Sequence, residues 1–501
     1  MQNQSFGDTT CSNLALVVRP FLQRHVKTAV GLSVAAVAWM AFKDSQGITA
    51  LIMVLAGGIL PCFAWTLARK PGLPIVPILG AQTVLFYGMP LLVQNPGVMR
   101  FGMDAINAVC FDIFLFGLAV TLGWMFVTRS FRFNSRPTCH QFDFLGGKNQ
   151  ERLAIIGPVL LAASVAFLAL NSLRMLTLLP GGAFPIIRAI ADAAGIGGAL
   201  IGGYFVSVSI LRGTGRVIYW ALLASHSILT IYNYTLFPAT GLLTAMLIGV
   251  FLGRGKLPYI PIIVCGLLFS FLNLSKFDMR KRYWMEGEAY AYQELSDLPA
   301  RFSEWADLSW EALTVPEDPE LKDTARETQR LTERVNNLAN LLEAREAMVD
   351  EGIKPFGGGS YTIIPALLIP RILWPDKPRT HEGMVALNVH FGRQTREESM
   401  TTYISWGLLP EAYANFGAIW GALICGFFLG GFAGALEFWS RPYPFTSLEA
   451  LIFLSVAVQF GTSFEMVASV WLTSMFQMVI ALIIGTAFFV KKTRPAAQTA
   501  T

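Results

Sequence analysis

The chain has 501 residues, of which 54% are hydrophobic and only 14% are charged, and its formal net charge is +5. Soluble domains carry about 25% charged residues, so this composition excludes an ordinary soluble globular protein. Apolar runs of about 20 residues recur along the sequence, and each can cross a hydrocarbon core of about 30 Å as a helix. The basic excess is typical of cytoplasmic loops of membrane proteins, and we expect no nucleic-acid partner.

The apolar runs predict an all-α polytopic membrane protein with about 12 transmembrane helices. The first run follows three basic residues and superficially resembles a signal peptide. It has no obvious A-x-A cleavage site and a second run follows at once, so we interpret it as a retained first helix. The predicted spans lie at about 28–42, 48–68, 73–94, 104–128, 153–171, 190–211, 216–234, 236–253, 257–274, 410–437, 446–464 and 467–490.

Basic residues alternate between the two sides of these spans. Clusters such as Arg69 with Lys70, and later Lys491 with Lys492, fall on one side, and short cytoplasmic loops are the ones that carry such clusters. Both termini are therefore predicted to be cytoplasmic, and the long polar segment to be periplasmic in a bacterium. The predicted organisation is helices 1–9 in 1–274, a periplasmic loop in 275–409, helices 10–12 in 410–490 and a cytoplasmic tail in 491–501.

Within the loop, residues from about 320 to 349 are rich in helix formers. Their apolar residues recur at spacings of three and four, which predicts an amphipathic helix. We interpret it as a surface helix that packs on the periplasmic side, and a coiled-coil partner site is the alternative. The apolar positions are Leu331, Val335, Leu338 and Leu342.

The stretch at about 357–379, GGGSYTIIPALLIPRILWPDKPR, has a different character. Its apolar part from Tyr361 to Trp374 is too short to span, and its three prolines forbid one straight helix. We predict a re-entrant or interfacial element with Trp374 at headgroup depth. Non-helical backbone at that depth needs protein or a water-filled cavity around it, which makes this region a candidate substrate cavity.

Ionisable and polar side chains flank this element and form the predicted site. Guanidinium groups make bidentate bonds to phosphate oxygens, so the cations suit a substrate that carries phosphate. Histidine and carboxylate side chains can act as general acids or bases. The candidates are Arg371, Lys377, Arg379, His381, Glu382, Arg393 and Arg396, with Tyr361, Glu411 and Asn415 beside them and Arg280 and Arg282 after the ninth span.

Several of these residues have a structural alternative. Arg280 and Arg282 flank a span and could anchor to lipid headgroups instead of a substrate. Arg371 could bond a carbonyl of the broken helix, and His381 could be an ordinary loop histidine. Within the spans, Asp112 and His226 are expected to point into the bundle and to form structural hydrogen bonds. The scattered cysteines suggest no disulfide framework, and neither they nor the acidic residues suggest a metal site.

No P-loop, dinucleotide fingerprint, HExxH or GxSxG motif is present, so we expect neither cytosolic nucleotide chemistry nor a cofactor. Two late stretches carry a resemblance instead. The sequence IPRILWPDKPR at 369–379 and the sequence EAYANFGAIWGALICGFFLG at 411–430 are similar to patterns of the Wzy-type polymerases of bacterial oligosaccharide repeat units. The rest of the chain resembles that family by its architecture.

The resemblance implies an inverting glycosyltransfer at the outer face of the inner membrane. A glycan on undecaprenyl pyrophosphate would move onto the next lipid-linked repeat unit. Arginines of the site would stabilise the leaving pyrophosphate, and His381, Glu382 or Glu411 would serve as the base. Partners would be membrane lipids, the lipid-linked donor and acceptor, and further a flippase and a chain-length regulator.

Three other functions stay open. A ligase of the O-antigen type would use the same donor with a different acceptor. A flippase or other transporter would have no chemistry, and it predicts a charged cavity within the spans and internal repeats, neither of which is evident. A scaffold of an envelope assembly complex would leave the cationic cluster without a role.

Overall fold

The computed structural model describes residues 11–43, 47–68, 72–131, 138–142, 150–178, 183–232, 234–285, 295–314, 336–369, 373–401, 404–444, 447–486 and 490–493. Its contacts divide the chain into two compact units. Unit 1 comprises Met1–Phe142 and Val335–Thr501, and unit 2 comprises Asp143–Arg334. This division differs from the predicted organisation, because the predicted loop at 275–409 contributes to both units.

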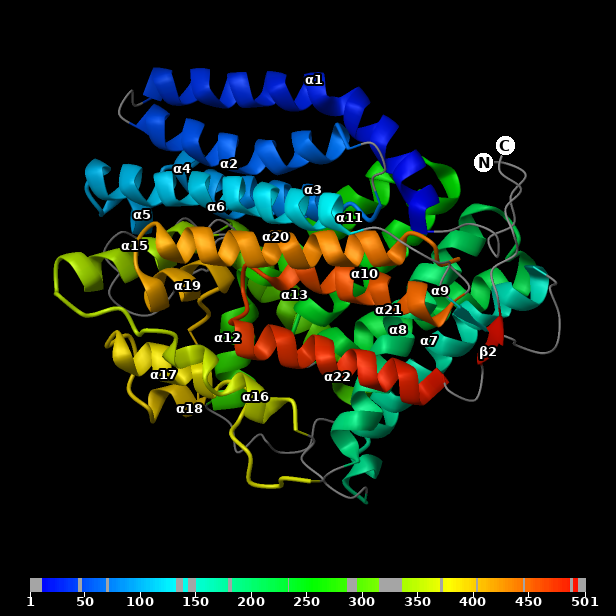
Figure 1. Cartoon of the computed structure of the whole chain (residues 1–501). Coiled ribbons are helices and arrows are strands. Elements are labelled where there is room, and N and C mark those ends of the chain that lie inside the picture. Colours follow the sequence, from blue (N-terminus) through cyan, green and yellow to red (C-terminus); the bar gives the residue numbers. More distant parts are fainter. Residues whose placement is uncertain are drawn as a thin grey trace. The chain divides into compact units, whose positions relative to one another are not determined.

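Unit 1 is built around two long apolar helices, α6 and α20, which pack side by side with α2 on the other face of α6 (Figure 1). The described helices of this unit are α1 (Cys11–Lys43), α2 (Ile48–Thr66), α3 (Ile75–Thr83), α4 (Met89–Leu92), α5 (Pro96–Met99), α6 (Met103–Ser130), α15 (Asn337–Val349), α16 (Ile364–Leu367), α17 (Glu382–His390), α18 (Glu398–Thr401), α19 (Leu408–Phe416), α20 (Trp420–Ser440), α21 (Leu448–Gln459) and α22 (Ala468–Thr486).

Glycines bring α6 close to both neighbours. A Cβ atom on Gly117 of α6 would lie 2.0 Å from the carbonyl oxygen of Gly57 in α2. A Cβ atom on Gly430 of α20 would lie 2.0 Å from the carbonyl oxygen of Val120 in α6. Small residues are the usual means of close helix packing in membranes, where van der Waals contact replaces the hydrophobic driving force.

Unit 2 consists of α7 (Gln150–Ser172), α8 (Phe184–Ser207), α9 (Gly213–Ile231), α10 (Phe237–Arg254), α11 (Tyr259–Leu274), α12 (Lys276–Arg280) and α13 (Leu298–Thr314). Helix α8 packs against α7 and α10. The sequence did not predict α13, which packs on α11 and buries Trp305 in a cluster with Leu272 and Met279.

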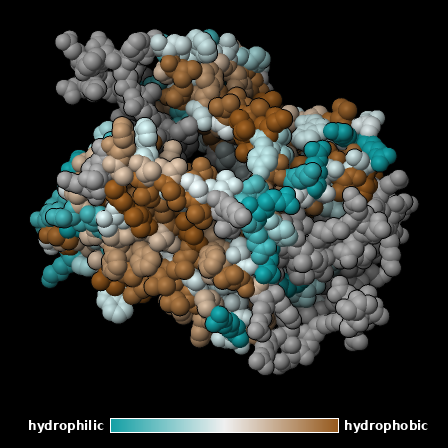
Figure 2. Space-filling model, turned by 90° about the horizontal axis from the view of Figure 1, so that it is seen from above, coloured by the Kyte–Doolittle hydropathy of each residue, from teal (hydrophilic) through white to brown (hydrophobic). Residues whose placement is uncertain are grey.

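The chain is a multi-pass membrane protein. Among the described residues, seven helices are long and apolar enough to cross a membrane, or eight if the bent pair Tyr259–Leu274 and Lys276–Tyr283 is one span. Three apolar helices are shorter, so the predicted count of about 12 spans stays a prediction. Hydrophobic side chains cover much of the face shown in Figure 2, and hydrophilic ones gather in separate groups.

The predicted tenth span at 410–437 is wrong as a single helix. Helix α19 ends at Phe416 and α20 begins at Trp420, because Gly417 and Ile419 have positive φ angles of 80° and 64°. The carboxylate of Asp112 in α6 accepts a hydrogen bond of 2.9 Å from the Ile419 amide at the start of α20. The break therefore has a buried polar partner, and Asp112 forms the structural hydrogen bond expected of it.

Two further predictions need correction or restriction. The amphipathic helix predicted at 320–349 is seen as α15 from Asn337 onward, with Leu338 and Leu342 buried, and its earlier residues lie outside the described part. A short antiparallel sheet departs from the purely helical class, since β1 (Cys139–Phe142) pairs with β2 (Val490–Thr493).

Candidate functional site

Three of the predicted site residues, Glu411, Asn415 and Tyr361, lie in or against α19. Glu411 lies in α19 with none of its surface exposed. Its Oε1 accepts a hydrogen bond of 2.7 Å from the Ser360 hydroxyl, and its Oε2 accepts one of 2.5 Å from the Ala468 amide. Burial raises the pKa of this carboxyl to about 7, against the opposing effect of the two hydrogen bonds. Because both oxygens are engaged and buried, Glu411 ties three segments together and does not face solvent.

Asn415, one turn after Glu411, extends the same buried cluster. Its amide nitrogen donates to the Ser360 hydroxyl at 2.9 Å and to the Glu411 carbonyl at 2.8 Å. The backbone carbonyl of Asn415 accepts a hydrogen bond of 2.8 Å from the Gly357 amide, so the turn that begins the 357–379 stretch is fixed to α19. Tyr361, at the end of that turn, stacks on Phe416 with ring centroids 5.8 Å apart.

Lys377 is buried, whereas a lysine that binds phosphate in a substrate cavity needs an accessible ammonium group. Its ammonium donates hydrogen bonds to the carbonyls of Leu367 at 2.7 Å and Ile369 at 2.6 Å. These carbonyls lie at and just beyond the end of α16, where helical partners are missing. In this structure Lys377 therefore caps the broken helix, the role considered for Arg371 from the sequence. Arg371 itself lies outside the described residues.

The first turn of α17 carries the remaining candidates for proton transfer. His381 stands at the N-cap position, and Glu382 in the first turn forms an ion pair with the exposed Arg396. Burial lowers the pKa of the His381 imidazole below its usual value, because the charged form loses hydration. The imidazole is therefore neutral at pH 7 and able to accept a proton. Arg379, two residues earlier, is exposed.

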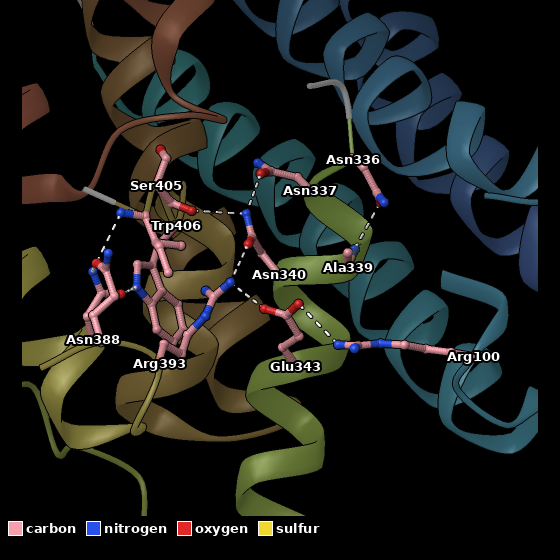
Figure 3. A network of polar contacts seen from close by, with 12 residues as sticks. Arg100, Asn336, Asn337, Ala339, Asn340, Glu343, Asn388, Arg393, Ser405 and Trp406 are labelled. Carbon is pink, nitrogen blue, oxygen red and sulfur yellow. Dashed lines mark hydrogen bonds and ion pairs between the residues drawn. The ribbon is translucent and has the colours of Figure 1, made fainter. Parts of the chain in front are cut away.

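Arg393 forms the centre of a second polar network, drawn in Figure 3. Its guanidinium pairs with Glu343 of α15, donates to Asn340 Oδ1 at 3.1 Å and lies 4.8 Å from the centre of the Trp406 ring. The other oxygen of Glu343 pairs with Arg100 at 3.2 Å, at the C-cap of α5. Arg393 thus holds the segment after α17 against α15.

The indole of Trp406 connects this network to α17. Its Nε1 donates to Asn388 Oδ1 at 2.6 Å, and Asn388 in turn donates to Gln394 at 2.9 Å. The sequence did not mark Glu343, Trp406 or Asn388 as site residues, because no motif distinguishes them from ordinary loop and helix residues.

Two predicted residues belong to unit 2 and are described apart from this site. The guanidinium of Arg280 donates to the Tyr234 carbonyl at 3.0 Å, and Arg282 pairs with Glu304. His226, also in unit 2, shares a hydrogen bond of 2.9 Å with Ser164, as expected for a structural role.

Among the described residues, no group of three or more His, Cys, Asp or Glu side chains lies where it could hold a metal ion. Comparison with protein-family models, with curated proteins and with solved structures gives no match.

Proposed function

We propose that this membrane protein is a glycosyltransferase that polymerises lipid-pyrophosphate-linked oligosaccharide units at the outer face of a bacterial inner membrane. The observation that carries the proposal is the start of α17, where the His381 imidazole has a lowered pKa and the exposed Arg379 stands two residues away. A neutral base beside a cation is what transfer from a pyrophosphate donor requires. The resemblance of 369–379 and 411–430 to Wzy-type polymerases supports the same conclusion.

The arrangement of contacts along α6 is compatible with this location. Arg100, just before α6, pairs with Glu343 of α15, whereas β1, after α6, pairs with β2 near the C-terminus. Helix α15 therefore lies near the start of α6, and β2 pairs with the strand that follows α6 in sequence. The alternation of basic residues predicts a periplasmic site and a cytoplasmic C-terminus, and these would lie at opposite ends of a membrane-spanning α6.

In the proposed reaction, a hydroxyl oxygen of the acceptor glycan attacks the anomeric carbon of the donor glycan. The bond from that carbon to the pyrophosphate oxygen breaks with inversion, and its electron pair remains on the pyrophosphate. Arg379 stabilises this developing negative charge. His381 accepts the proton of the attacking hydroxyl. Glu411 acts on neither substrate, and it positions the 357–361 turn through Ser360.

The test is polymerisation by the purified protein in lipid nanodiscs, with a lipid-pyrophosphate-linked repeat unit as both donor and acceptor. We expect His381→Gln to lower the rate by about 10²-fold or more, the usual contribution of a general base. His390→Gln is the matched control, because His390 lies at the other end of α17 and contacts the Lys354 carbonyl. Equal rates for the two variants would remove His381 from the mechanism.

The same preparation separates the alternative functions. Transfer only to an added acceptor such as a lipid A core would favour the ligase reaction. Movement of the intact lipid-linked unit across a vesicle membrane, with no new glycosidic bond, would favour a transporter. Formation of a ladder of products that differ by one repeat unit supports the polymerase.

A further inference from the structure

Both ends of the stretch between Ser360 and Thr380 are connected to the start of α22. At its start, the Ser360 hydroxyl bonds Glu411, which also accepts the amide of Ala468 at the first residue of α22. At its end, the Thr380 carbonyl accepts a bond of 3.1 Å from the hydroxyl of Ser469, the second residue of α22. Helix α16, inside this stretch, packs against α22. We call this stretch the excursion: both of its ends are held at the start of α22, and α16 within it packs against that helix.

The excursion exposes large apolar side chains. We call Leu368, Ile369, Leu373 and Trp374 the apolar patch, and the exposed fraction of Leu373 reaches 75%. The sequence from 355 to 370 has no charged residue, and Arg371 is the one charged residue between Leu368 and Trp374. An exposed apolar group of this kind on a soluble surface marks an interaction site. In a membrane protein the lipid hydrocarbon is the partner that such side chains match.

The outer side of α22 has the same character. Phe476, Ile480 and Ile483 are exposed and recur at spacings of four and three, so they form one apolar stripe along α22. A stripe like this on an apolar helix of a multi-pass protein faces lipid. Because α16 packs against α22, the apolar patch is carried by an element that borders this lipid-facing helix.

Lys377 removes the main obstacle to placing irregular backbone in hydrocarbon. Every backbone polar group there needs a partner inside the protein, because no water is present to supply one. Two carbonyls at and just beyond the end of α16, those of Leu367 and Ile369, accept hydrogen bonds from the buried Lys377 ammonium. These two carbonyls next to the patch thus have partners inside the protein, while the apolar side chains of the patch are exposed.

From these observations we propose that the apolar patch is embedded in the hydrocarbon of the lipid bilayer, and that Lys377 acts as an internal cap that keeps it there. The excursion is then a re-entrant anchor that holds the start of α17 at the membrane surface. This inference does not depend on the proposed reaction, because a lipid contact can be measured without any glycan substrate.

The experiment places a fluorescent NBD group at residue 373, as Leu373→Cys, in the full chain after replacement of its six native cysteines. The protein is reconstituted in vesicles of phosphatidylethanolamine and phosphatidylglycerol that contain doxyl-labelled lipid. Val349→Cys on α15 is the matched control, since Val349 is also apolar and 61% exposed. We expect doxyl lipid to quench NBD at 373 severalfold more strongly than at 349, and aqueous iodide to show the reverse order. Iodide quenching at 373 equal to that at 349, without doxyl quenching, would overturn the proposal.

The role of Lys377 has its own variants. Lys377→Met keeps the aliphatic stem but removes the donors, so we expect iodide to reach NBD at 373 severalfold better, whereas Lys377→Arg should preserve the protection. Size-exclusion chromatography and circular dichroism verify that each variant is folded. If folded Lys377→Met keeps full doxyl quenching at 373, Lys377 is not the cap. Absence of polymerisation by the wild-type protein, with normal quenching at 373, would count against the proposed function alone.

Discussion

The two buried glutamates of the α19–α20 region show how different surroundings give one side chain two roles. Glu437, near the end of α20, has no exposed surface and pairs with Arg441 at 3.2 Å, and it accepts bonds from the Gly72 amide and the Trp124 indole. Glu411 is equally buried, but the Ser360 hydroxyl and the Ala468 amide that hold it are uncharged.

The comparison separates a buried carboxyl that has a cationic partner from one that is held only by neutral donors. A carboxylate with a cationic partner is an ion pair whose two halves depend on each other. A carboxyl held only by neutral donors in a buried site has a raised pKa, and for Glu411 the value of about 7 lies in the physiological range. We therefore expect the candidate site to respond to pH through Glu411.

The largest effect is expected at the ion pair. Glu437→Gln leaves the Arg441 guanidinium without its counter-charge, and breaking a buried pair in this way costs about 3–5 kcal/mol. Glu411→Gln keeps an acceptor for one of the two neutral donors and should cost about 1 kcal/mol. Thermal unfolding of both variants in the same detergent measures the difference. Equal losses of stability would mean that the two carboxylates do not differ as described.

The next effect is a pH dependence that belongs to Glu411. Its pKa is raised from 4.5 to about 7 on folding, so the folded state binds more protons than the unfolded state between these values. The contribution of Glu411 to stability is therefore complete below pH 4.5 and is lost as the pH rises through 7. We expect the thermal midpoint of Glu411→Gln to fall less between pH 5 and pH 8 than that of the wild type, measured in a single buffer series. A parallel fall in both proteins would assign the dependence to other groups.

A smaller effect is expected where Arg393 joins α15 to the segment after α17. Arg393→Ala removes the bonds to Glu343 and Asn340 and the stacking on Trp406, and hydrogen bonds to charged groups contribute about 1.5–3 kcal/mol. Arg393→Lys should recover only part of this, because lysine lacks the planar fork of arginine. Protease sensitivity of the 391–406 segment reports the effect locally, and unchanged cleavage in Arg393→Ala would contradict it.

The smallest effect is expected at the other partner of Glu343. The Arg100 side chain is 56% exposed, and exposed ion pairs contribute about 0–1 kcal/mol. Arg100→Ala should therefore leave the thermal midpoint almost unchanged at physiological salt. A loss as large as that of Arg393→Ala would contradict this and show that Arg100 contributes as much as Arg393 to the contact with α15.

Much of the fold follows from apolar patterning, because lipid exposure demands continuous apolar runs and each predicted run contains a described helix. The break in the tenth predicted span did not follow, since it depends on Asp112, which lies 307 residues from Ile419 in sequence. The helix α13 was missed because its surface is too polar to read as a span, and its core residue Trp305 is recognised only once α11 is beside it.

The sequence suggests a candidate site, but it does not show which of its residues are buried and which are exposed. Residue types alone placed His381, Lys377 and Glu411 together as substrate-facing candidates. The structure buries Lys377 against two carbonyls and Glu411 against Ser360, and it leaves Arg379 exposed. Exposure and hydrogen-bond partners are tertiary properties, so no pattern of charged residues could assign these roles in advance.

The most direct test of the account is the length of the surface glycan in a bacterial strain that lacks this protein and is complemented with the wild type or with Arg379→Ala. Electrophoresis of the glycan is compared at equal protein level, with Lys354→Ala as a control outside the proposed site. The account predicts long polymer with the wild type and with Lys354→Ala, and single repeat units with Arg379→Ala. Long polymer in the Arg379→Ala strain, or unattached lipid-linked polymer in the strain without the protein, would contradict the central claim.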